Sequence, residues 1–171
     1  MQLKTLSIKT NTFIGVNMTI KKKECGDCSL CCKLPEINYF KKKKESFKWC
    51  DDCNVGVGCK IYNERPKGCR DFYCLYHGGL TNLKPNKVGF FIFIEREEAT
   101  TKKILTIYSE PNRLENIPKL IMKDSGGYNL VDQGYAFHIR YSKNDDEIAI
   151  FDLEKFGMNL KKVSRKEIEN A

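Results

Sequence analysis

Cysteine is absent from the last 97 residues of this 171-residue chain, although nine cysteines lie between Cys25 and Cys74. Long apolar runs are also absent, because no stretch approaches the roughly 18 residues of a membrane-spanning helix. The first 17 residues lack the charged start, apolar stretch and small-residue cleavage site of a secretory signal. We therefore expect a cytoplasmic protein with no membrane partner.

The uneven placement of the nine cysteines favours metal binding over disulfides. Cytoplasmic thiols stay reduced unless a metal takes them, and an odd number of cysteines does not give a complete set of disulfides. A disulfide scaffold normally spreads its bridges over a whole small domain, whereas here a large cysteine-free half follows. The cysteines are therefore predicted to be metal ligands.

Positive charge is concentrated in the same part of the chain. The formal net charge is +8, and residues 1–75 carry 15 Lys and Arg against 8 Asp and Glu. Such an excess is typical of proteins that bind nucleic acids. It also fits a second explanation, in which the cations offset the thiolates and lower their pKa values. The run Lys41 to Lys44 is interpreted as a solvated helix face or loop tip, with a phosphate-binding patch as the alternative.

The composition predicts one folded domain of the α+β class. Hydrophobic residues make up 41% of the chain, which is enough for a core. Residues 1–24 form an N-terminal extension, either an added edge strand or a segment that precedes a start at Met18. Residues 25–171 form the domain. Within it, residues 25–79 are a metal-organised region of loops and short helices, packed on a small antiparallel β-sheet in residues 84–160.

Apolar and alternating segments in the second half predict the strands of this sheet. Val88 to Glu95 (VGFFIFIE) indicates a strand buried on both faces, and Ile104 to Tyr108 is expected to pair with it. Tyr135 to Tyr141 and Ile148 to Leu153 carry the strongest hairpin signal.

Two helices are predicted around these strands. Arg113 to Lys123 has apolar residues at helical spacing, and Pro118 within it indicates a short or kinked helix. Gly126 and Gly127 are expected to end that helix. The polar tail after Lys161 is interpreted as a final short helix.

The first cysteine cluster has the spacing Cys25-x2-Cys28-x2-Cys31-Cys32. A Cys-x2-Cys pair lets two thiolates reach one ion from a tight turn, and Gly26 relaxes the backbone there. A third cysteine three residues later extends the arc, as in ferredoxin-like runs. Adjacent cysteines do not easily face the same ion, so Cys31 and Cys32 are expected to divide their roles.

The second cluster consists of Cys50, Cys53, Cys59, Cys69 and Cys74. Cys50 and Cys53 form another two-point clamp, and the glycines before Cys59 suit a turn that brings in a third thiolate. Nine cysteines exceed the four that one closed zinc site uses. The count therefore predicts two metal sites or one multinuclear centre, without telling which thiols share a site.

Zinc and an iron–sulfur cluster both fit these ligands. Two Cys-x2-Cys pairs suffice for a zinc tetrahedron, and a Cys-x2-Cys-x2-Cys run with a remote cysteine suits iron and sulfide. The two histidines add little to this set. His77 lies three residues past Cys74 and is an additional candidate ligand. His138 lies within a predicted strand and is interpreted as an ordinary packed or exposed side chain.

The chain resembles the YkgJ-type cysteine-cluster family of zinc- or iron-chelating proteins. The first cluster is similar to the CxxCxxCC signature of that family, and Gly58 to Cys74 (GCKIYNERPKGCRDFYC) is similar to its GCxIYxxRPxxCRxFxC block. Leu83 to Gly89 resembles a segment that follows in some members. The resemblance covers residues 25–90 and implies metal chelation without a defined reaction. Flagellin lysine N-methylases carry a related pattern, but no glycine-rich S-adenosylmethionine loop is visible here.

Three residues of the second block are assigned supporting roles. Arg65 and Arg70 are interpreted as donors of hydrogen bonds to the sulfurs, and the alternative is that they bind an anionic substrate in a pocket. Tyr62 is expected to pack in the core with its hydroxyl satisfied.

The sequence leaves three functions open. The first is a metalloprotein with redox or protein-modifying chemistry. The second is a non-catalytic zinc module that binds nucleic acid or a protein through a lysine-rich face. The third is metal storage or delivery.

Overall fold

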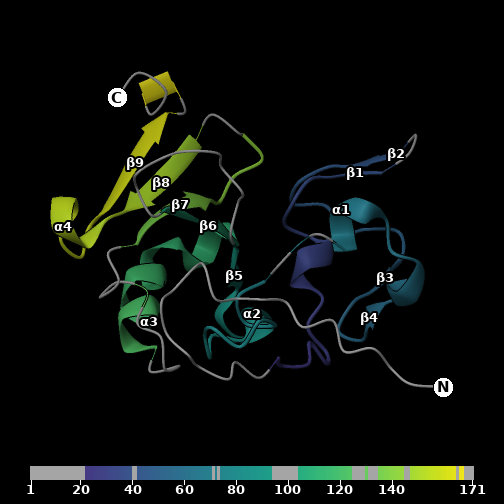
Figure 1. Ribbon diagram of the computed structural model, residues 1–171. Helices are drawn as coiled ribbons and strands as arrows, with labels where there is room; N and C mark the ends of the chain where they lie inside the picture. Colours follow the sequence, from purple (N-terminus) through teal and green to yellow (C-terminus); the bar gives the residue numbers. More distant parts are fainter. Residues whose placement is uncertain are drawn as a thin grey trace.

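The computed structural model describes residues 22–39, 42–70, 72, 74–93, 104–124, 130, 135–144, 147–164 and 166–167 (Figure 1). Nearly all of the expected N-terminal extension, and Gly126 and Gly127, lie outside these residues. The described elements include short helices and small β-sheets, which confirms the α+β class. Within the described residues, no helix is long and apolar enough to cross a bilayer.

A five-stranded sheet dominates the second half of the chain, with its strands in sequence order. The strands are β5 (Phe90–Phe93), β6 (Ile104–Ser109), β7 (Ala136–Arg140), β8 (Glu147–Phe151) and β9 (Leu160–Ser164). The predicted pairing of β5 with β6 and the predicted β7–β8 hairpin are both confirmed. The sheet departs from the expected antiparallel arrangement at one pairing, since β6 and β7 are parallel.

The first strand of this sheet, β5, begins later than the apolar run from Val88 to Glu95 predicts. Pro85–Val88 form the short helix α2, which has proline in its first turn and ends at Gly89. Gly89 has φ of 80°, a left-handed conformation that glycine adopts without a Cβ penalty. The chain therefore turns at Gly89, and β5 starts at Phe90 with its first three side chains buried.

The parallel pairing of β6 and β7 requires a connection that crosses the sheet. This connection contains the 3-10 helix η3 (Pro111–Asn116), followed directly by α3 (Ile117–Lys123). Pro118 lies in the first turn of α3, where its missing N–H is tolerated. The predicted short helix is therefore present, and its proline marks a beginning instead of a kink.

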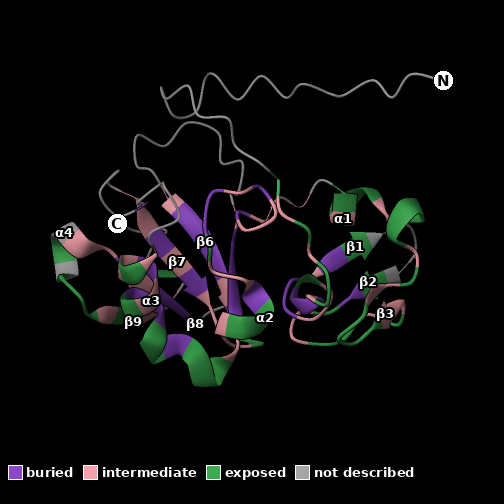
Figure 2. Cartoon of the chain, turned by 90° about the horizontal axis from the view of Figure 1, so that it is seen from below, coloured by how far each residue is buried: buried purple, intermediate pink, exposed green. Residues whose placement is uncertain are grey.

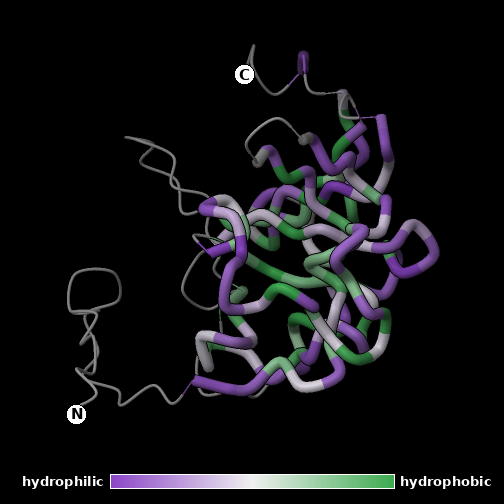
Figure 3. The backbone as a smooth tube through the Cα atoms, turned by 90° about the vertical axis from the view of Figure 1, so that its right-hand side faces the viewer, coloured by the Kyte–Doolittle hydropathy of each residue, from purple (hydrophilic) through white to green (hydrophobic). Residues whose placement is uncertain are grey.

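The main hydrophobic core lies between this connection and one face of the sheet. The buried side chains Leu114, Ile117 and Ile121 from η3 and α3 belong to one cluster with strand residues such as Ile107 and Phe137. Figure 2 shows buried positions along β6, β7 and β8. In Figure 3 the hydrophobic segments lie mainly in the interior, and hydrophilic ones form outer loops.

A strand occupies the start of the tail that was predicted to be a short helix, and helical residues follow it at Lys166 and Glu167. The chain leaves β8 through the short helix α4 (Leu153–Phe156), whose N-cap Asp152 accepts a hydrogen bond from the Lys155 amide. Leu160–Ser164 then pair with β8 as an antiparallel strand. β9 is an outer strand of the sheet and carries Lys161 and Lys162. Lysines on an edge strand commonly prevent it from pairing with other chains, which explains why this strand has a polar sequence.

The cysteine-rich half consists of short elements, as predicted. They are η1 (Leu30–Cys32), the paired strands β1 (Ile37–Tyr39) and β2 (Lys42–Lys44), the paired strands β3 (Cys53–Asn54) and β4 (Gly58–Cys59), η2 (Tyr62–Glu64) and α1 (Lys67–Arg70). Elements of two to four residues bury little apolar surface, so they need another source of stability.

This half packs on the sheet through a second hydrophobic cluster. Leu30 and Leu34 from the η1 segment lie against Phe91 of β5. The Phe91 ring contacts the Phe72 ring edge to face, with 5.0 Å between ring centroids. Cys74 forms a β-bridge with Phe93, so the end of the cysteine-rich half runs along β5. The sheet therefore supports the cysteine region from one side.

Candidate metal centre

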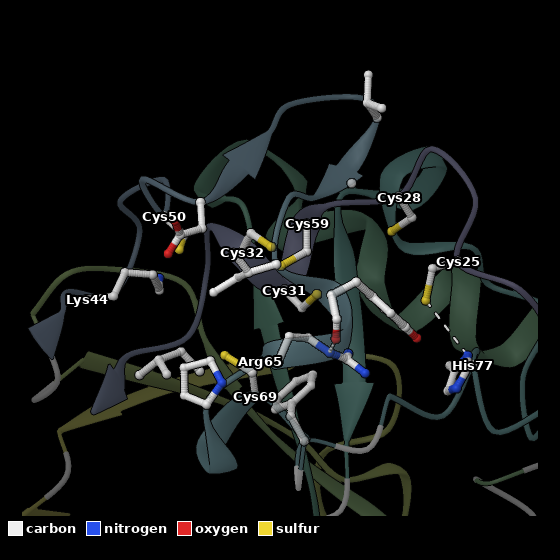
Figure 4. Close-up of a pocket in the computed structure, with 18 of the residues that line it drawn as sticks. Cys25, Cys28, Cys31, Cys32, Lys44, Cys50, Cys59, Arg65, Cys69 and His77 are labelled. Atoms are coloured by element: carbon white, nitrogen blue, oxygen red, sulfur yellow. Dashed lines mark hydrogen bonds between the residues drawn. The ribbon is translucent and has the colours of Figure 1, made fainter. Parts of the chain in front are cut away.

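Seven of the nine cysteines line a single pocket with a volume of about 400 Å³ (Figure 4). These are Cys25, Cys28, Cys31, Cys32, Cys50, Cys59 and Cys69. They come from both sequence clusters, so residues up to 44 positions apart meet at one place. All nine cysteines are free thiols.

Local turns position the thiols of the first cluster. The Cys28 amide donates to the Cys25 carbonyl at 3.0 Å, and Gly26 between them has φ of 55°. Cys31 and Cys32 follow on η1, whose tight turn holds adjacent cysteines in one helical segment. Both line the pocket, so their positions do not show the expected division into one metal ligand and one packing residue.

Backbone hydrogen bonds bring the second cluster to the first. The Cys50 amide donates to the Cys32 carbonyl at 2.9 Å, and the Cys53 amide donates to the Cys50 carbonyl at 3.0 Å. Cys53 lies opposite Cys59 in the β3–β4 pair. Cys69 lies on α1. The two cysteine clusters are therefore directly joined at Cys32 and Cys50.

The pKa values of these thiols show how closely the sulfurs interact around Cys32. Hydrogen bonding with Cys31 and burial raise the pKa of Cys32. Burial raises the pKa of Cys69 and raises the pKa of Cys53 to about 11. In both cases the charge on Cys32 is the second cause of the rise. Each thiolate therefore disfavours its neighbours, and a bound cation would relieve this repulsion.

A second group of sulfurs lies at the other end of the pocket, around Cys25. The Cys25 Sγ is 3.8 Å from the Nδ1 of His77, and this nitrogen is also 2.7 Å from the Lys23 carbonyl oxygen. Burial and the nearby Cys28 raise the pKa of Cys25. His77 lines the pocket, so the structure keeps it among the candidate ligands.

Cys74 lies behind the pocket, outside its lining residues. It packs in the hydrophobic cluster that contains Phe91, and burial raises its pKa to about 11. The charges of Cys25 and Cys28 still contribute to this shift, so Cys74 adjoins the second group of sulfurs. Cys53 is likewise close to Cys32 without lining the pocket.

The lysine run was expected to be a solvated helix face or loop tip, but its described part lies on the strand β2, and Lys44 is buried whereas Lys43 is exposed. The Lys44 side chain is 7% exposed and lines the pocket from β2. The ammonium donates to the carbonyl oxygens of Lys33, Glu45 and Lys48 at 3.0, 3.0 and 3.1 Å. Burial lowers the pKa of Lys44, and the thiolates of nearby cysteines oppose that shift. Lys44 therefore places a fixed positive charge beside the sulfurs.

The three predicted supporting residues have different positions. Arg65 lies in the pocket, donates from Nε to the Tyr62 carbonyl at 2.7 Å, and stacks 3.6 Å from the centroid of the Tyr62 ring. It opposes the rise in the pKa values of both Cys25 and Cys69. Tyr62 also lines the pocket, but it is 46% exposed and does not pack in the core as expected. Arg70 is exposed and is not among the lining residues.

The types of donor in the pocket suit a soft metal, although the side chains would have to move closer together to enclose one ion. Among the described residues, no three His, Cys, Asp or Glu side chains are grouped closely enough to hold one. Thiolate donors select zinc, copper(I) or iron–sulfur clusters over magnesium and calcium. Asp52 and Glu24 contribute carboxylates to the lining, but they are outnumbered by sulfur. The donor set thus fits zinc or iron with sulfide.

Sequence reasoning did not find Lys44, because a run of four lysines carries no periodicity that distinguishes one of them. His138 lies on β7, outside the pocket lining.

Comparisons of the chain with models of protein families, with curated proteins and with solved structures found no match.

Proposed function

We propose that this protein binds zinc or an iron–sulfur centre through the thiols of its cysteine pocket. The observation that carries this proposal is the meeting of seven thiols from several short segments in one cavity. The helices and strands of these segments have only two to four residues, so their own hydrogen bonds stabilise them little. Metal ligation would supply part of the folding free energy that such small elements lack.

We assign the thiols to two groups that would serve as ligands, and the groups adjoin, since the charge of Cys32 also raises the pKa of Cys25. Cys32 is the centre of the larger group, which also contains Cys31, Cys50, Cys53, Cys59 and Cys69. The smaller group contains Cys25, Cys28 and Cys74, with His77 beside Cys25. Zinc would act as a cross-link between the segments, and an iron–sulfur centre would add electron transfer.

Membership of the YkgJ-type family belongs to the same proposal. It is supported by the two sequence motifs together, since the adjacent pair Cys31 and Cys32 is too small a feature to identify a family. The pocket adds that residues from both motifs lie around one cavity. The nucleic-acid alternative gains no comparable support, because Lys44 of the lysine run is directed into the protein.

Metal analysis of anaerobically purified protein tests the proposal. We expect bound zinc, or iron with acid-labile sulfide and a brown colour, in a fixed ratio to the chain. Cys69→Ser should lower that ratio, because it removes a pocket thiol with the smallest possible change. His138→Ala is the matched control, since it removes an imidazole, a side chain of a type that can bind metals, from outside the pocket and should leave the ratio unchanged. A chain that neither retains nor takes up either metal would refute the proposal.

A further inference from the structure

The pocket is larger than its metal ligands require. A tetrahedral zinc site is closed and filled by its own four ligands, whereas this cavity measures about 400 Å³. That volume lies within the range of roughly 300–1,000 Å³ that is usual for small-molecule sites. The pocket therefore has room for a ligand beside a metal that is held by one of the two groups of thiols, once those thiols have closed on it.

Apolar side chains form much of the remaining wall. They are Ile37, Val57, Ile61, Pro66 and Phe72, and the ring of Tyr62 joins them. Val57 is 67% exposed, so part of this wall borders solvent. A mostly apolar cavity with a few polar groups that fix orientation is the usual form of a small-molecule site.

Arg65 is the polar group best placed to orient such a ligand. Its side chain is held by the hydrogen bond from Nε to the Tyr62 carbonyl and by stacking on the Tyr62 ring. In Figure 4 it extends between the side of the pocket that carries Cys69 and the side that carries Cys25 and His77. Tyr62 therefore fixes the guanidinium at the wall of the cavity, where it is partly exposed.

No carboxylate among the described residues forms an ion pair with Arg65. In contrast, the other cation in the lining, Lys44, is bound by three backbone carbonyls. The thiolates of Cys25 and Cys69 lie near enough to Arg65 to interact with its charge. A metal would offset part of the charge of those thiolates, although four thiolates on one Zn²⁺ keep a net charge of −2. The guanidinium has five N–H donors, and those not used by Tyr62 or the sulfurs are available to an external anion.

We propose that the pocket binds a small organic carboxylate with an apolar body, held by Arg65 and packed against the apolar wall. A guanidinium pairs with a carboxylate through two parallel hydrogen bonds, while the apolar body covers the side chains next to Val57 and Phe72. This proposal rests on the proposed function in one respect, namely that a metal occupies the neighbouring thiols.

Fluorine NMR titration with para-fluorobenzoate tests the carboxylate site on the full-length, metal-containing protein. The neutral para-fluorobenzamide has nearly the same shape and serves as the ligand control. We expect the benzoate to bind in the millimolar range or tighter. The benzamide should bind at least about tenfold more weakly, since it lacks the charge that pairs with the guanidinium. Equal binding of the two probes would overturn the proposal.

Variants of Arg65 locate the interaction. Arg65→Gln should weaken benzoate binding about tenfold or more. Arg65→Lys keeps the positive charge beside the sulfurs but loses the planar fork, so it should retain metal and still bind benzoate more weakly. Arg70→Gln is the matched control, because Arg70 lies outside the pocket lining and should have no effect. Unchanged benzoate binding in both Arg65 variants would refute the site.

Metal content measured on the same samples separates this proposal from the previous one. A chain that holds no metal but binds benzoate through Arg65 would refute the metal centre and support the anion site. A metal-loaded chain without Arg65-dependent binding would support the metal centre and refute the anion site.

Discussion

The replacement Lys44→Met tests how strongly the cysteine region depends on a buried positive charge. Methionine is unbranched and similar in length, so it fills the same space without the ammonium. The substitution leaves the carbonyl oxygens of Lys33, Glu45 and Lys48 without the donor that now binds all three. These carbonyls belong to the two segments that precede and follow the β1–β2 pair. Without the Lys44 ammonium the two segments lose their common hydrogen-bond donor, and both are held less firmly.

The expected loss of stability follows from these three contacts. A buried acceptor without a donor costs about 1–3 kcal/mol. The lower end of that range applies here, because the region borders solvent and methionine avoids the unfavourable burial of a charge. We therefore expect the free energy of unfolding to fall by about 3 kcal/mol. Metal affinity should fall as well, because the positive charge near Cys32 and Cys50 is removed.

Urea unfolding of the reduced, metal-free chain, followed by circular dichroism, measures the first effect. The matched control is Lys43→Met on the same strand, whose side chain is 60% exposed and pairs with Glu36 at 3.0 Å. An exposed pair of this kind contributes less than about 1 kcal/mol. If both variants unfold within about 0.5 kcal/mol of each other, the buried ammonium has no special structural role and the reasoning fails.

Two further predictions concern packing and pH. Phe91→Ala should lower the free energy of unfolding in urea by about 3–5 kcal/mol, because Phe91 is 2% exposed and contacts Phe72. Met158→Ala, at a side chain that is 49% exposed, should change it by less than about 0.5 kcal/mol, and a similar effect of both would contradict the packing argument. The metal-free, reduced chain should lose stability as pH rises from 9 to 11, since the folded pKa of Cys74 is about 11 against an ordinary 9.0 and the folded state therefore holds its proton longer. Cys74→Ala should make this alkaline loss shallower, and an unchanged pH profile in urea unfolding would refute the assignment.

Much of the sheet could be predicted because its strands have local signals. Phe90 to Phe93 are almost continuously apolar, and the pairings with Ile104 to Ser109 and within the later hairpin follow from neighbouring segments in the sequence. The parallel pairing of β6 with β7 has no local signal, because it depends on how the intervening helices cross the sheet. The strand Leu160–Ser164 was missed for a related reason, since its lysines suit an edge strand only when β8 is beside it.

The candidate site was predictable in its residue types and less so in its geometry. Cys-x2-Cys spacing identified the thiols, but spacing does not tell that the Cys50 amide donates to the Cys32 carbonyl and so joins the two clusters. Arg65 and Arg70 looked equivalent in sequence, and only the turn before α1 and the helix itself separate them. Tyr62 was expected in the core because aromatic residues are usually buried, whereas its position at the pocket makes it a platform for Arg65.

The bridge between Cys74 and Phe93 has a consequence for aggregation. The five-stranded sheet has two outer strands, β5 and β9, and β9 carries the charged side chains Lys161 and Lys162. β5 is rich in phenylalanine, and its outer edge is instead covered by Cys74 and Leu75, whose amide donates to the Ile92 carbonyl at 2.9 Å. Unfolding of the cysteine region would uncover this apolar edge, which is a template for pairing between chains. Loss of metal would weaken the cysteine region, so a larger fraction of molecules would expose β5 to self-association while the rest of the sheet is still folded.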